Sequence, residues 1–106
     1  MKTFDELFAE HLDFTTGKFT KATWHGALLH AKKELEEVME SISNNEPKER
    51  QAEEFGDLIG CIIDAAKRAG VYHMVNDCFE AKIIINKGRE WKDNGDGSYS
   101  HIKKQS

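Results

Sequence analysis

The sequence predicts an all-α fold, a four-helix bundle with a short irregular C-terminal tail. Only one of the 106 residues is proline, and strong helix formers such as Glu, Lys, Ala and Leu are abundant. Apolar residues recur at helical spacing, and the segments between the periodic stretches are short. A chain of this length is expected to form one domain, here the whole of residues 1–106.

The first helix is expected to begin at the capping-box sequence from Thr3 to Glu6. It is expected to end near Asp13, because the following segment, TTGKFT at 15–20, is loop-like around Gly17.

The second helix is expected over residues 23–43, where two asparagines provide a stop. Pro47 suits the first turn of a third helix, which should reach Ala69 with Gly70 as the residue that ends it. A fourth helix is expected over residues 72–91. The tail, WKDNGDGSYSHIKKQS, is rich in turn residues and predicts a short hairpin or an ordered loop.

Composition excludes several classes of protein. The net charge of −4, with basic residues interspersed among acids, argues against a nucleic-acid binder. No apolar run approaches the roughly 20 residues of a membrane span, and the charged N-terminal segment does not resemble a secretion signal. Cys61 and Cys78 lack CxxC spacing and are expected to be buried, reduced thiols. These features predict a cytoplasmic protein.

Two pairs of acidic residues at helical spacing are the most informative feature. Glu34 and Glu37 form one pair and Glu54 and Asp57 the other, and residues three apart share a helix face. If the two helices pack face to face, four carboxylates converge, and each pair of charges about 6 Å apart costs roughly 3 kcal/mol at an effective dielectric near 20. A bound cation removes this repulsion. Oxygen ligands alone favour Mg²⁺, with Mn²⁺ as a possible substitute.

An ordinary solvated acidic face is the alternative explanation, since Glu favours helices. One neighbour of the acidic pairs weighs against it. Asp64 lies within the apolar segment GCIIDAA, where a charge needs a partner. Of the five histidines, His30 is the one that lies beside the acidic line. A lone helical His is nevertheless more often a hydrogen-bonded core residue than a ligand.

Apolar positions predict what these helices pack against. The second helix has a stripe at core spacing, formed by Leu28, Ala31, Leu35, Val38 and Ile42. Apolar residues on the third helix cover more than one narrow stripe, which predicts a subunit interface and hence a homodimer or homotetramer. They are Phe55, Leu58, Ile59, Ile62, Ile63 and Ala66.

Three polar residues of the fourth helix share one face, Lys82, Asn86 and Arg89. They could neutralise glutamates in a salt-bridged bundle, or Lys82 and Arg89 could hold the phosphates of a nucleotide. Spacing leaves both readings open. Trp24, which precedes the second helix, could stack on a base or form the edge of the core.

The ordered set of motifs resembles the MazG-like superfamily of all-α nucleoside triphosphate pyrophosphatases. The hallmark of that superfamily is ExxE followed by ExxD, which matches the two acidic pairs. The resemblance is closer to the dATP/dGTP diphosphohydrolase branch, which includes the phage MazZ proteins. The matching segments are EHxxF at 10–14, HxxKELxE at 30–37, DxAxRAG at 64–70 and KxxxNxxRxW at 82–91.

This resemblance implies a Mg²⁺-dependent enzyme that cleaves a nucleoside triphosphate, with a purine deoxynucleotide (dGTP or dATP) expected, to the monophosphate and pyrophosphate. It implies that the four acidic-pair carboxylates are metal ligands and that Glu34 or Glu37 is the catalytic base. It also implies substrate-binding roles, with Asp64 supporting the metal site or the sugar. The other expected substrate-binding residues are Lys82, Asn86, Arg89, His30 and Trp24.

Two other functions remain open from the residues alone. A non-catalytic bundle would bind nucleotide or metal without releasing product. A helical interaction module would present its acidic stripes to a basic partner protein and would be indifferent to divalent metals.

Overall fold

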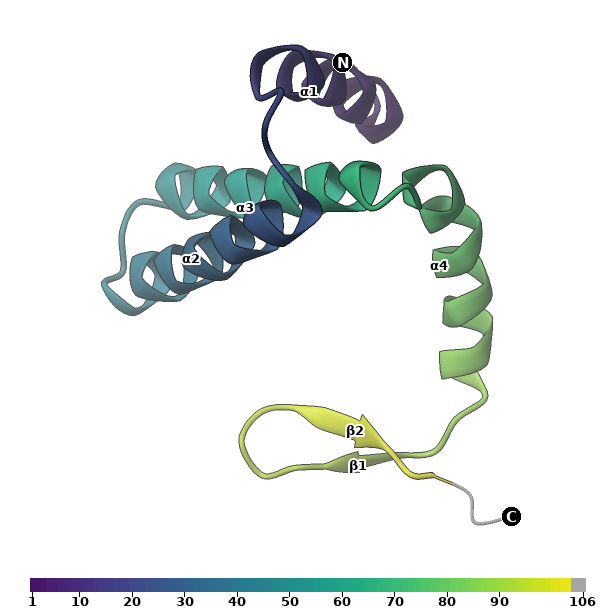
Figure 1. Ribbon diagram of the computed structural model, residues 1–106. Helices are drawn as coiled ribbons and strands as arrows, with labels where there is room; N and C mark the ends of the chain where they lie inside the picture. Colours follow the sequence, from purple (N-terminus) through teal and green to yellow (C-terminus); the bar gives the residue numbers. More distant parts are fainter. Residues whose placement is uncertain (104–106) are drawn as a thin grey trace. The chain divides into compact units, whose positions relative to one another are not determined.

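The computed structural model describes residues 1–103, which form four helices followed by one pair of antiparallel strands (Figure 1). The predicted all-α class and the number of helices are therefore confirmed. The elements are α1 (Phe4–Lys18), α2 (Trp24–Ser43), α3 (Lys48–Arg68), α4 (Tyr72–Lys87), β1 (Trp91–Asp93) and β2 (Tyr99–His101).

Contacts divide the chain into two compact units, one ending at His73 and the other beginning at Met74. Each is described by itself. The expectation of one domain over residues 1–106 stays a prediction.

Helix α1 begins where the sequence predicts. The Thr3 hydroxyl accepts a hydrogen bond from the backbone N–H of Glu6, and the Glu6 carboxylate accepts one from the N–H of Thr3, which completes the capping box. These two bonds satisfy backbone donors that the first helical turn leaves free.

Helix α1 ends later than predicted. The expected end near Asp13 is wrong, because the helix continues to Lys18 through the threonines that suggested a loop. The Thr15 hydroxyl lies 2.6 Å from the carboxylate of Asp64 on α3, and the Thr16 hydroxyl donates to the Leu12 carbonyl at 2.6 Å. A tertiary hydrogen bond and a local one thus override a weak helix propensity.

Helices α2 and α3 lie side by side and form the main packing of the first unit (Figure 1). Thr23, the predicted first residue of this helix, caps α2 through its hydroxyl, so the helix begins one residue later, at Trp24. The turn between the helices places Asn45 at a φ of 53°, and the Gln51 side chain donates to the Glu46 carbonyl at 2.7 Å. The hydrogen bond holds the turn between the two helices. The antiparallel packing of α2 and α3 then places the two acidic pairs on facing surfaces.

The predicted apolar stripe of α2 is only partly buried. Ala31 and Val38 are buried, whereas Leu28, Leu35 and Ile42 are each nearly half exposed. On α3, the apolar residues expected at an interface also reach solvent, among them Phe55, Ile59 and Ile62. Contiguous exposed apolar side chains mark interaction surfaces more often than free surface.

Helix α4 ends at Lys87, so its expected extension to Trp91 is wrong. Trp91 instead begins β1 and pairs with His101 of β2. The tail thus forms the hairpin that was one of its two predicted conformations. Gly95 and Gly97 have φ values of 82° and 87° in its turn, a region that favours glycine.

Both cysteines are free. Cys61 is half-buried, but Cys78 is exposed, so the expectation of a buried thiol is wrong for Cys78. In the part of the chain that the structure describes, no helix has the length and apolar character needed to cross a membrane.

Two glycines of α3 provide a matched test of how closely α1 and α3 pack. A Cβ atom at Gly60 would lie 3.1 Å from a ring carbon of His11, whereas one at Gly56 would meet nothing within 4 Å. We predict that Gly56→Ala stabilises the protein by up to about 1 kcal/mol through helix propensity. Gly60→Ala should gain clearly less, because His11 must move. Urea unfolding measures both, and equal stabilisation would contradict the packing described.

The hairpin turn predicts a dependence on acid. Ser98 donates to the Asp96 carboxylate from its hydroxyl and its backbone N–H, and these bonds hold the pKa of Asp96 below its ordinary value of 3.8. Their stabilisation is therefore present above pH 3.8 and is lost as the pH falls below it. We expect the Ser98 amide resonance to shift in that range in NMR spectra. The same step in Asp96→Asn would refute this assignment.

Candidate functional site

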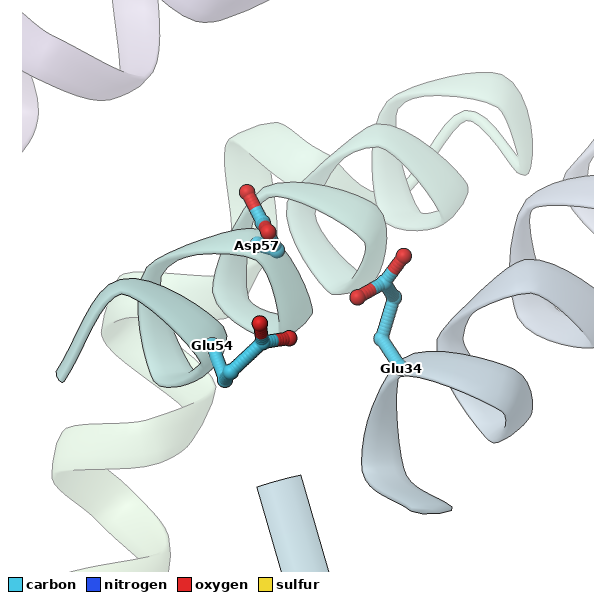
Figure 2. Close-up of side chains that lie close together, drawn as sticks. All are labelled: Glu34, Glu54 and Asp57. Atoms are coloured by element: carbon cyan, nitrogen blue, oxygen red, sulfur yellow. The ribbon is translucent and has the colours of Figure 1, made fainter. Parts of the chain in front are cut away.

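Three carboxylates from two helices meet in the first unit. Glu34 of α2 and Glu54 and Asp57 of α3 each offer an oxygen, and these oxygens lie within 4.8 Å of one another. Figure 2 shows the Glu34 side chain extending from its helix toward the two side chains of the other. The arrangement follows from helical spacing, since Glu54 and Asp57 lie three residues apart on the face that meets α2. We call these residues the carboxylate triad.

Two members of the carboxylate triad are withdrawn from water. The side chains of Glu54 and Glu34 are 5% and 12% exposed. In each of them the Oε2 atom is buried without a hydrogen-bond partner among the described residues. A buried carboxylate oxygen without a donor is costly, and here two such oxygens belong to one cluster. This all-oxygen donor set fits a hard divalent cation such as Mg²⁺ or Mn²⁺.

The other oxygens of the same carboxylates are held by neighbours. His30 Nε2 lies 2.9 Å from Oε1 of Glu34, and the Arg50 guanidinium lies 2.8 Å from Oε1 of Glu54. Each carboxylate is therefore oriented by one partner and leaves its second oxygen for the cluster. Groups that orient ligands in this way tune metal sites. His30, a predicted substrate-binding residue, contacts the triad, whereas the sequence analysis did not single out Arg50.

Glu37, the fourth predicted ligand, lies beside the carboxylate triad rather than within it. Protonated Glu37 can donate a hydrogen bond to Glu34, which raises the pKa of Glu37, and the charge of Glu34, burial and the charge of Glu54 raise it further. Glu37 therefore interacts electrostatically with two members of the triad, Glu34 and Glu54. Glu37 also lines a small hollow of about 240 Å³ together with Ser41 and Arg50.

A larger pocket of about 660 Å³ opens from the triad into the first unit. Glu34 and Asp57 lie on its wall, and so do His30, Asp64 and the aromatic ring of Phe19. A volume in this range accommodates a small-molecule ligand. The pocket wall is thus acidic beside the triad, and elsewhere it combines polar and apolar residues.

Cys61 also lines this pocket. Burial raises the pKa of its thiol, and the charges of Glu34, Asp57 and Asp64 raise it further. The thiol is therefore protonated at neutral pH and contributes no negative charge to the pocket.

Asp64 has the partners that its apolar surroundings demand. The Thr15 hydroxyl donates to Oδ1 at 2.6 Å, and Arg68 donates to Oδ2 at 3.0 Å. Asp64 itself is 8% exposed. The expectation that this buried charge is paired is confirmed. Arg68 was missed as a site residue, although its place four residues after Asp64 was a usable signal.

Four predicted site residues remain: Trp24 in the first unit, and Lys82, Asn86 and Arg89 in the second. Trp24 is half exposed at the start of α2 and is not among the residues that line the pocket. Lys82, Asn86 and Arg89 belong to the second unit, where Arg89 donates to the Asn86 side chain at 3.0 Å. Within the described part of the second unit, neither Lys82 nor Arg89 forms an ion pair with an acidic side chain. Their roles stay predictions.

Arg50 offers a test of how the triad is held without metal. It is the cation that contacts Glu54, so Arg50→Gln should lower the melting temperature measured in EDTA, because a buried carboxylate then loses its partner. Mn²⁺ should restore more stability to this variant than to the wild type. Arg50→Lys, which keeps the charge, serves as the control. A melting temperature for Arg50→Gln that equals the wild-type value in EDTA would contradict this role.

Comparison with known proteins agrees with the geometry. A family model described as dATP/dGTP pyrophosphohydrolase matches residues 7–106. Among solved structures, the fold is similar to that of a chain described as the MazG-like pyrophosphohydrolase of cyanophage S-2L, bound to dGDP and three catalytic Mn²⁺ ions per active site. The TM-score is 0.76 at 24% identity, and the match covers 97% of this chain and 100% of that one. The comparison with curated proteins gives no match.

Proposed function

Because the chain belongs to the dATP/dGTP pyrophosphohydrolase family, we propose that it cleaves dGTP or dATP, with Mg²⁺, to the monophosphate and pyrophosphate. The observation that carries this proposal is the carboxylate triad at the edge of a ligand-sized pocket. A nucleotide then has its phosphates at the acidic end, where a metal offsets their charge, and its nucleoside in the remaining space.

Glu34, Glu54 and Asp57 would hold the divalent ion, with Glu37 beside them. Mg²⁺ or Mn²⁺ bound there would supply positive charge for the triphosphate and lower the pKa of a coordinated water. The orphaned oxygens of Glu34 and Glu54 support this assignment. So does the similarity to a structure that contains dGDP and Mn²⁺.

The chain's own residues divide the remaining work. Glu37 or Glu34 takes a proton from the attacking water, as the adjacency of these two carboxylates allows. His30 keeps Glu34 oriented from its far side. Lys82 and Arg89 hold phosphate oxygens and Asn86 orients the nucleotide, an assignment that rests on their motif. Trp24 stacks on the base in this proposal, and its side chain is half exposed at the start of α2.

We also propose that the enzyme is a homodimer or homotetramer. The exposed apolar residues of α2 and α3, such as Leu35, Met39, Phe55 and Ile62, supply the surface that a second copy would cover. Residues 1–106 act as one catalytic domain in this proposal, located in the cytoplasm and without a nucleic-acid or membrane partner. Sedimentation equilibrium tests the assembly, and a monomer at micromolar concentration would exclude it.

The reaction is tested by product analysis. Incubation with each of the eight common nucleoside triphosphates and Mg²⁺ should convert dGTP and dATP fastest, with the monophosphate and pyrophosphate as products on chromatography. EDTA should stop the conversion. Release of orthophosphate with a diphosphate would exclude the proposed bond cleavage. Binding of nucleotide without any product would favour the non-catalytic alternative, and indifference to both nucleotide and metal would favour an interaction module.

The acidic site is tested by two neighbouring glutamates of α2. Glu37→Gln should lower kcat by about 100-fold or more, because it removes a proton acceptor or ligand while keeping the shape of the side chain. Glu36→Gln is the matched control, since Glu36 is exposed and lines none of the pockets described. Circular dichroism should show the same helix content in both. Wild-type turnover in Glu37→Gln would refute the assignment.

A further inference from the structure

Arg68 is the most extensively bonded side chain of the first unit, and the proposed mechanism does not use it. Its three guanidinium nitrogens donate to three different acceptors. Nε donates to the Asp64 carboxylate at 3.0 Å, Nη1 to the Ala22 carbonyl at 3.0 Å and Nη2 to the Thr15 carbonyl at 3.1 Å. The side chain is 11% exposed. Each nitrogen is therefore already engaged, which leaves Arg68 poorly suited to bind a phosphate.

The acceptors belong to separate parts of the fold. Asp64 is on α3, Thr15 is in the last turns of α1, and Ala22 lies in the segment that joins α1 to α2. The Thr15 hydroxyl closes the network by donating to the other oxygen of Asp64 at 2.6 Å. Charge-assisted bonds of this kind are stronger and more directional than neutral ones. We call Thr15, Asp64 and Arg68 the latch.

The latch forms part of the pocket wall. Thr15, Ala22 and Asp64 all line the 660 Å³ pocket, and so does Phe19, whose backbone N–H donates to the same Thr15 carbonyl that Arg68 contacts. Thus the guanidinium fixes the end of α1 and the turn that carries the Phe19 ring. The triad residues form a different part of the wall, contributed by Glu34 and Asp57.

Outside the latch, one further side-chain hydrogen bond joins α1 to α3, between His11 Nε2 and the Gly60 carbonyl at 3.1 Å. Helix α1 contacts α3 but makes no comparable packing with α2 in the described residues, and its large apolar side chains Phe4, Leu7 and Phe14 are exposed. The buried residues of α1 are Leu12 and Thr15, and Thr15 itself belongs to the latch. A wall that rests on so few buried contacts depends on its hydrogen bonds for its shape.

We propose that the latch positions the wall that receives the nucleoside, so that it controls nucleoside binding and not metal or phosphate binding. Arg68 and Thr15 are positioning residues in this proposal, because they act through Asp64 and the backbone of the α1–α2 connection. The proposal rests on the proposed function, which places the nucleoside in this pocket. It adds residues on α1 and at the end of α3 to a site otherwise defined by acidic pairs.

Two adjacent threonines give a matched test. Thr15→Val keeps the size of the side chain and removes the bond to Asp64. Thr16→Val removes a hydroxyl that bonds only the Leu12 carbonyl of its own helix. R68Q is the second latch variant. Isothermal titration calorimetry with Mn²⁺ present would measure the affinity of each variant for dGDP and for inorganic pyrophosphate, which has phosphates but no nucleoside.

We expect Thr15→Val and R68Q to weaken dGDP binding at least about tenfold, as loss of a bond to a charged group does. Pyrophosphate binding should change by less than about threefold in both, and Thr16→Val should resemble the wild type. A general loss of structure would weaken both ligands together, so equal weakening overturns the proposal. Unchanged dGDP affinity in Thr15→Val and R68Q also overturns it. If R68Q does not fold, as judged by circular dichroism, Thr15→Val decides alone.

The binding assay separates this inference from the proposed reaction. A wild-type protein that binds dGDP but releases no pyrophosphate from dGTP would refute the reaction. The latch would still be supported by selective loss of dGDP affinity in Thr15→Val. An active wild type whose dGDP affinity is unaffected by Thr15→Val and R68Q would refute the latch alone.

Discussion

The structure depends on an electrostatic conflict between two packed helices. Packing α2 against α3 stabilises the first unit, yet the same packing brings Glu34, Glu54 and Asp57 together with two carboxylate oxygens that lack partners. A cluster that only served stability would not retain this arrangement, because apolar residues of similar size would pack there without electrostatic cost. The conflict is best explained by function, in which a divalent cation completes the cluster.

Part of this site could be predicted from the sequence, because it depends on the spacing of residues within a single helix. Residues three apart on a helix share a face whatever surrounds them, so the pairing of Glu54 with Asp57 needs only the helix itself. The convergence of Glu34 on that pair requires only that the helices form a hairpin with a short turn. The end of α1 could not be predicted in this way. It depends on the Thr15 hydroxyl reaching Asp64, a residue 49 positions away.

Burial was harder to predict than spacing. Periodicity marks which residues of α2 share a side, but it does not say which of them a neighbour covers, and so Ala31 is buried while Leu35 is half exposed. The partners of ionisable groups raised the same difficulty. The sequence indicated that Asp64 needs a counter-charge, and Arg68 supplies it from the same helix. The Thr15 hydroxyl, in contrast, reaches Asp64 only through the packing of α1 against α3.

The site therefore combines two physical tasks in neighbouring parts of one pocket. The carboxylate triad supplies charge for a cation, and the latch of Thr15, Asp64 and Arg68 supplies a shaped wall that carries Phe19. The Arg68 guanidinium is paired with Asp64 and offsets its charge. This division explains why both oxygens of Asp64 are hydrogen-bonded, whereas Glu54 of the same helix keeps one oxygen without a partner. The most direct test is anomalous diffraction at the manganese edge from crystals grown with MnCl₂. We expect a peak within coordinating distance of carboxylate oxygens from Glu34, Glu54 and Asp57. A map in which manganese lies elsewhere, with those three side chains turned apart, would contradict it.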